Sequence, residues 1–94
     1  MAPHVTSAEH LLGGYFHADW TDEFADAEEA IVAMLGGEPA DRRHAAAAEL
    51  RALLPAEPDA ALPAILRDRL GCFHAGPDGD ERAWLAHVAD RLSA

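Results

Sequence analysis

The chain has 94 residues, the usual size of one domain, and 22 of them are alanine. Large apolar side chains are therefore few, and we do not expect a roomy buried active site. Seventeen carboxylates are set against seven arginines and no lysine, which gives a net charge of -10. This balance argues against nucleic acid or an anionic membrane as the main partner and favours a basic protein partner.

The negative charge is concentrated in the first part of the chain. Residues 1–41 carry nine carboxylates and no arginine, a charge of -9, whereas residues 42–94 carry eight carboxylates and all seven arginines, a charge of -1. The acidic part also contains many aromatic and large aliphatic side chains, which a disordered acidic tail would lack. We therefore expect an ordered acidic surface.

Cysteine usage and hydropathy indicate the compartment. Cys72 is the only cysteine, so it cannot form an internal disulfide, and the chain is compatible with a reducing cytoplasm. The first residues have neither the basic start nor the apolar run of a signal peptide, and no stretch approaches the roughly 20 apolar residues of a membrane span. The sequence predicts a soluble cytoplasmic protein with no membrane partner.

Apolar residues recur at helical spacing, and no segment alternates with a period of two for long enough to indicate a strand. The prediction is an all-α fold, a small bundle of about five helices in one domain over residues 1–94, with an ordered core at about 7–92. The first helix begins after Thr6 or Ser7 and is weakened or ended by Gly13 and Gly14. Its inward positions are Ala8, Leu11, Leu12 and Tyr15. Residues 17–24 are expected to be irregular.

Two further helices are predicted between Asp26 and Pro55. Asp26 with Glu29 resembles a capping box at the start of the second helix, which ends at Gly36 and Gly37. Pro39 suits the first turn of the third helix, and Pro55 ends it. The inward positions of the two are Ala27, Ala30, Ile31, Met34 and Leu35, then Ala46, Ala47, Leu50, Leu53 and Leu54.

The last two helices are separated by a turn-rich segment at residues 72–79. Asp59 is the predicted N-cap of the fourth helix and Gly71 its C-terminal stop. The fifth helix is predicted from about Asp80 to Leu92. Their inward positions are Leu62, Ile65, Leu66 and Leu70, then Trp84, Leu85, Val88 and Leu92.

Catalytic and metal chemistry have little support. His10, His17 and Asp19 are candidate metal ligands, but their spacing matches no metal motif, and Cys72 with His74 supplies only two more. Cys72 follows a helix-stopping glycine, where a small buried thiol is far more common than a nucleophile. No serine elbow or phosphate-binding loop is present. We expect no enzyme activity, no metal and no cofactor.

Residues 15–20, Tyr-Phe-His-Ala-Asp-Trp, form an aromatic and polar cluster. In a structural role, His17 and Asp19 hydrogen-bond the backbone of the turn while Tyr15 and Trp20 anchor the acidic segment to the core. In the alternative role, the same aromatic loop is an interface anchor. The sequence leaves both open.

The order of these motifs resembles the immunity proteins of bacterial contact-dependent growth inhibition systems, the CdiI-type family. That family has a leucine-rich start, Gly-Tyr-x-His-Gln-Asp-Trp, an acidic stretch and a helix with Glu-Glu-Ala. The matching residues here are Leu11–Trp20, Asp22-Glu23-Phe24, Glu28-Glu29-Ala30, Leu70-Gly71-Cys72 and Arg82-Ala83-Trp84-Leu85, with Ala18 where the family has glutamine.

The resemblance implies a small helical protein that binds and neutralises the C-terminal toxin domain of a partner effector. We predict that the acidic residues Asp22, Glu23, Asp26 and Glu29 contact a basic face of that toxin, with no nucleic acid involved. Tyr15, His17, Asp19 and Trp20 are the family-motif residues, with a structural or interface role. Two alternative functions are an acidic helical adaptor or regulatory domain and, less favoured, a small metal-binding protein or enzyme.

Overall fold

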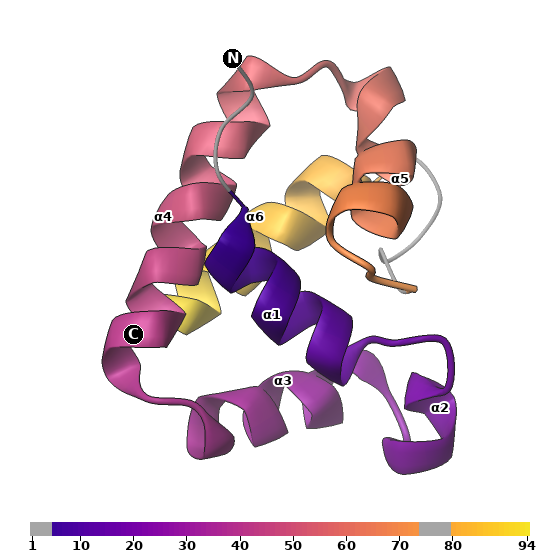
Figure 1. The fold of residues 1–94 in the computed structure, drawn as a ribbon, viewed down its shortest axis with the longest axis vertical. Coiled ribbons are helices and arrows are strands. Elements are labelled where there is room, and N and C mark those ends of the chain that lie inside the picture. The colour runs from indigo at the N-terminus through magenta and orange to yellow at the C-terminus, as the bar shows by residue number, and fades with distance from the viewer. Residues whose placement is uncertain (1–4, 74–79) are drawn as a thin grey trace.

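The computed structural model describes residues 5–73 and 80–94, and every regular element in these ranges is helical (Figure 1). The predicted all-α fold is confirmed, with five helical segments of seven or more residues when the three consecutive short elements of residues 59–69 are taken as one. The elements are α1 (Thr6–Tyr15), α2 (Trp20–Glu23), α3 (Ala27–Gly37), α4 (Ala40–Ala56), a 3-10 turn (Asp59–Ala61), α5 (Leu62–Ala64), a π-type segment (Ile65–Arg69) and α6 (Glu81–Leu92). The predicted turn at residues 77–79 lies outside the described ranges.

Helix α4 is the centre of the fold, because α6 and α1 make the most extensive contacts with it. Helix α3 touches α1 and α6 more sparsely and lies at one edge, with α2 beside its N-terminal end (Figure 1). Helix α5 lies at the opposite edge and contacts α6. No helix of the described residues is long and apolar enough to cross a membrane.

The buried side chains form one apolar cluster, and the predicted stripes supply most of it. Ala46 and Ala47 of α4, two of the predicted inward positions, are buried, which allows the neighbouring helices to pack closely against α4. Buried alanines on facing helices permit short interaxial distances because they have no side chain beyond Cβ. Five predicted inward residues are only partly buried and pack against the edge of the core: Tyr15, Ala27, Leu35, Leu54 and Trp84.

The N-terminus of α1 is capped by a residue far away in sequence. Val5 occupies the N-cap position and offers no side-chain bond. Glu49 of α4 instead accepts hydrogen bonds from the backbone N–H groups of Ser7 (3.2 Å) and Ala8 (2.9 Å). A carboxylate here satisfies two of the otherwise unpaired N–H groups and lies at the positive end of the helix dipole. This contact fixes the start of α1 against α4.

Of the two effects predicted for Gly13 and Gly14, an end of the helix is not observed at either glycine, because α1 continues to Tyr15. Gly13 instead provides room for the chain around Leu70 and Gly71. A Cβ at Gly13 would lie 2.9 Å from the Leu70 carbonyl oxygen. The absence of a Cβ at Gly13 therefore lets residues 70–71 pack directly against α1, and the neighbouring helical residues keep the glycine backbone in the helix.

The end of α4 also differs from the prediction, because Pro55 lies inside its last turn rather than ending it. Arg82 of α6 donates to the carbonyl oxygens of Leu54 and of Glu57, the latter at 2.6 Å. These are carbonyls that the helix end leaves without backbone donors. An arginine from another helix thus pairs with the carbonyls at the end of α4, which extends one residue past Pro55.

Asp59 does not act as the predicted N-cap, because its side chain makes no cap bond and instead pairs with Arg82. The fourth helix is consequently composite: a 3-10 turn, one turn of α-helix and a π-type segment. In that last segment the Leu70 N–H reaches back to the carbonyl of Ile65. Gly71, with φ +63°, ends it as predicted, because glycine adopts this left-handed conformation without a Cβ clash.

Helix α3 is held at both its start and its side. As predicted, Asp26 caps it: its carboxylate accepts from the backbone N–H of Glu29 at 2.8 Å. Glu28 pairs with Arg91 and lies 3.8 Å from the ring of His87, both on α6. The hydrogen bond from Arg91 holds the pKa of Glu28 below its usual value, so this surface pair is lost only as the pH falls through that lowered pKa.

Candidate protein-binding surface

The segment between α1 and α3 is more ordered than the predicted irregular loop, because residues 20–23 form the short helix α2. The ring of His17 organises the turn before it. Its Nδ1 accepts from the backbone N–H of Asp19 at 3.1 Å, so Nε2 carries the proton and donates to Glu23, also at 3.1 Å. The exposed Asp19 side chain makes no cap bond to α2. The turn is therefore held by the His17 side chain, as the structural role predicts, whereas Asp19 contributes its backbone N–H and its side chain does not cap α2.

Phe16 anchors this turn to the core. It is fully buried, and its ring makes edge-on contacts with Trp20 (5.3 Å between ring centroids) and Trp84 of α6 (5.4 Å). Edge-to-face geometry of this kind adds to the stability gained from burial alone. The carbonyl of Phe16 also accepts from the N–H of Phe73 at 2.8 Å. Sequence inspection placed Phe16 in a loop and did not identify it as a core residue.

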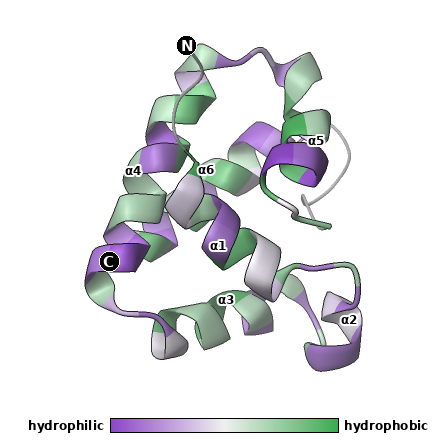
Figure 2. Cartoon of the chain, viewed as in Figure 1, coloured by the Kyte–Doolittle hydropathy of each residue, from purple (hydrophilic) through white to green (hydrophobic). Residues whose placement is uncertain are grey.

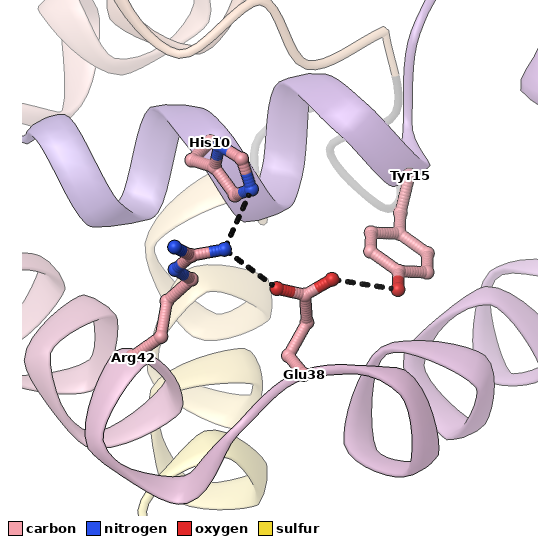
Figure 3. Close-up of polar contacts among 4 residues, drawn as sticks. All are labelled: His10, Tyr15, Glu38 and Arg42. Atoms are coloured by element: carbon pink, nitrogen blue, oxygen red, sulfur yellow. Dashed lines mark hydrogen bonds and ion pairs between the residues drawn. The ribbon is translucent and has the colours of Figure 1, made fainter.

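Tyr15 points to the other side of the turn, where a chain of polar contacts joins α1 to α4 (Figure 3). Its hydroxyl donates to one carboxylate oxygen of Glu38 at 3.0 Å. Arg42 donates to the other oxygen at 3.3 Å, and the same Arg42 nitrogen lies 3.0 Å from Nε2 of His10. Glu38 is well covered, with 14% of its side chain exposed. The four residues fix the corner between α1, α3 and α4.

Burial, together with the hydrogen bond and the negative charge of Glu38, raises the pKa of Tyr15 above its ordinary value of 10.0. Because Tyr15 is the only tyrosine, tyrosinate absorbance near 295 nm reports on it alone. We expect the midpoint of the Tyr15 absorbance titration to lie at a higher pH in the folded protein than in the unfolded chain. The associated stability is present below pH 10 and is lost as the pH rises through the raised pKa.

Glu38→Gln should move that midpoint part of the way back, because it removes the charge but leaves the burial. Circular dichroism at each pH serves as the control for unfolding. A wild-type midpoint equal to that of the unfolded chain would contradict the contact.

The four predicted contact residues lie together along one edge of the molecule. Asp22 and Glu23 are on α2, while Asp26 and Glu29 are at the start of α3, and all four are exposed (Figure 1). Two have structural tasks as well: Glu23 pairs with His17, and Asp26 caps α3. We call these four residues the acidic edge.

The candidate metal ligands have other partners. His10 bonds Arg42 and His17 bonds Glu23, while Cys72 is buried. Within residues 5–73 and 80–94, no three His, Cys, Asp or Glu side chains are grouped closely enough to hold a metal ion. His74 lies outside these ranges.

Both the sequence and the fold of this chain are similar to those of known proteins. A family model described as "CdiI immunity protein" matches residues 4–92. The chain belongs to the CdiI immunity protein family. A solved chain from the structure titled "Crystal structure of CdiA-CT/CdiI complex from Y. kristensenii 33638" is 29% identical, with a TM-score of 0.81 over 94% of this chain and 97% of that one. No curated protein sequence matches significantly.

The motif residues of this CdiI family member meet within the fold. Gly13 contacts Leu70 and Gly71, and Phe16 lies between Trp20 of its own motif and Trp84 of the last motif. Arg82 caps α4. These contacts are internal, so the motif residues hold the scaffold together. Ala18, where the family pattern has glutamine, is exposed.

Sequence inspection missed Glu38, Glu49 and Arg82, which connect helices distant in the chain. A charged residue on a helix gives no local signal of a partner 23 to 42 positions away. It also missed Val32, an apolar residue of α3 whose side chain is exposed. Its one available signal was the run of eight residues without a polar side chain at positions 30–37.

Proposed function

We propose that this CdiI family member binds the C-terminal toxin domain of a cognate CdiA effector and neutralises it by one-to-one association, without chemistry of its own. The observation that carries this proposal is the match over nearly the whole chain to a member of a CdiA-CT/CdiI complex, together with membership of the immunity family. Neutralisation inside the cytoplasm agrees with a single buried cysteine.

The acidic edge is the proposed electrostatic contact with a basic face of the toxin. Its four carboxylates are exposed, and no ion pair of the described residues joins one of them to an arginine; Glu23 pairs with His17, and Arg91 of α6 pairs with the neighbouring Glu28. Opposed charges accelerate association, and salt weakens this effect because the Debye length is about 8 Å at physiological ionic strength. The acidic edge should therefore act mainly on the association rate.

Binding kinetics with the purified toxin domain, measured over a range of salt concentrations, test the proposal. The variant D22N/E23Q/D26N/E29Q should slow association at low salt by about tenfold or more, and the difference should shrink at high salt. Asn remains a good N-cap at position 26, and Gln still accepts a hydrogen bond at position 23, so the fold is preserved.

A control with the same change in net charge, from -10 to -6 (-10 + 4), is E57Q/D68N/D80N/D90N. None of these residues belongs to the acidic edge, so this variant should retain most of the wild-type rate. Equal slowing by both variants would show that only net charge matters and that the acidic edge is not the contact. No binding of the wild-type protein, and no protection of toxin-expressing cells, would refute the immunity function itself.

A further inference from the structure

Helix α3 is unusual among the helices because it lies at the edge of the molecule and yet is apolar around most of its circumference. Residues 30–37, Ala-Ile-Val-Ala-Met-Leu-Gly-Gly, include no polar side chain. Figure 2 shows α3 coloured as hydrophobic over most of its length, whereas α4 and α6 alternate between hydrophobic and hydrophilic residues. A surface helix normally has a polar outward face, and one that is apolar all round is normally buried.

Only one side of α3 is covered by the rest of the chain. Ala30, Ile31 and Met34 face the core and are buried. On the outward side Val32 is 55% exposed, one of two large apolar residues with such exposure in the described ranges, and Gly36 follows one turn later, also exposed. Because residues four apart are neighbours on a helix surface, Val32 and Gly36 form a continuous strip.

Acidic residues flank this strip at both ends. Glu29 lies one turn before Val32 and belongs to the acidic edge, and Asp26 precedes the helix. Asp41 is exposed beyond the other end of the helix, whereas Glu38 is well covered there and is held by Tyr15 and Arg42. An apolar centre with a charged rim is the usual organisation of a protein-binding surface.

We infer that the outward face of α3, centred on Val32 and Gly36, is the apolar centre of the toxin interface, with the acidic edge as its rim. This inference rests on the proposed function. The occupant is an apolar patch of the toxin domain bordered by Arg or Lys side chains. A second copy of this chain fits poorly in a parallel pairing of two α3 helices, because that pairing brings the two acidic edges together, and like charges across an interface are unfavourable.

Gly36 gives the strip its shape, whereas the Cβ position of Gly37 faces the Tyr15 hydroxyl. A Cβ at Gly36 would meet no other atom within 4 Å, so the helix backbone there is open to close approach by a partner. Filling this position leaves the fold intact and obstructs the strip. Val32 is equally suited to substitution because more than half of its surface is exposed.

Binding of the purified toxin domain to Val32→Gln, Val32→Arg and Gly36→Gln tests the inference. Val32→Arg should weaken affinity at least about tenfold, since residues at interface centres carry most of the binding energy. Gly36→Gln should weaken it in the same direction. The loss caused by the neutral Val32→Gln should persist at high salt, unlike that of the acidic-edge variant, because an apolar contact is not screened.

The matched controls are Ala48→Arg, which places the same charge on an exposed position of α4, and Gly14→Gln, which fills an equally open glycine on α1. Both should bind like wild type, and circular dichroism should show all variants folded. Wild-type affinity in the α3 variants would overturn the inference while leaving the immunity function intact. Self-association of the wild-type chain that Val32→Arg abolishes would also overturn it, in favour of a second copy. Failure of the wild type to bind toxin would refute the proposed function.

Discussion

Replacing Phe16 by alanine is expected to lower the free energy of unfolding by about 3–5 kcal/mol, a large share of the roughly 5–15 kcal/mol available to a domain of this size. Phe16 is fully buried between Trp20 and Trp84, so its removal leaves a cavity where α1, α2 and α6 meet. Urea denaturation followed by far-UV circular dichroism measures the loss.

Phe73 provides the matched control, because it is 55% exposed and contacts the same turn through its backbone N–H. Phe73→Ala keeps that hydrogen bond and should cost less than about 1 kcal/mol. Where Phe16→Ala does not fold, Phe16→Leu should show an intermediate loss of about 1–2 kcal/mol. Equal effects at positions 16 and 73 would mean that Phe16 is not the anchor of the turn.

Local chemistry made much of this fold predictable. The apolar stripes located the inward faces of the helices. Asp26 was predicted to cap α3 because it precedes an apolar helical stripe by one position and lies three residues before Glu29, from whose backbone N–H it accepts a hydrogen bond. Gly71 ends its helix through its own left-handed backbone conformation. Each of these signals lies within a few residues of its effect. The exposure of the four acidic-edge carboxylates was equally predictable, because unpaired charged side chains are rarely buried.

The errors concern residues whose role depends on distant partners. Gly13 suggested a helix end because glycine weakens isolated helices. The residue that it contacts, Leu70, is 57 positions away in the sequence and gives no local signal. Pro55 suggested another helix end because nothing local shows that Arg82 binds the carbonyls of Leu54 and Glu57 on either side of it. Asp59 suggested an N-cap, and the same arginine takes its carboxylate. Tertiary contacts overrode local propensity in each case.

The strongest test of this tertiary control compares two adjacent glycines. Gly13→Ala should lower the free energy of unfolding by about 1–3 kcal/mol, because the new Cβ would lie 2.9 Å from the Leu70 carbonyl and force the chain at residues 70–71 to move. Gly14→Ala should raise it by about 0.5–1 kcal/mol, because a Cβ there meets nothing within 4 Å and alanine favours the helix. Both sites belong to α1, so helix propensity alone predicts the same sign for the two.

Cys72 gives a local readout of the same displacement, since it is buried and is the only thiol in the chain. Its N–H bonds the Leu66 carbonyl at 2.8 Å immediately after Gly71, so movement of that turn should expose it. Its reaction with a thiol reagent should be faster in Gly13→Ala and unchanged in Gly14→Ala. Stabilisation by both substitutions, with Cys72 equally protected, would show that α1 does not approach the turn as closely as the structure has it, and that Gly13 is not a packing residue.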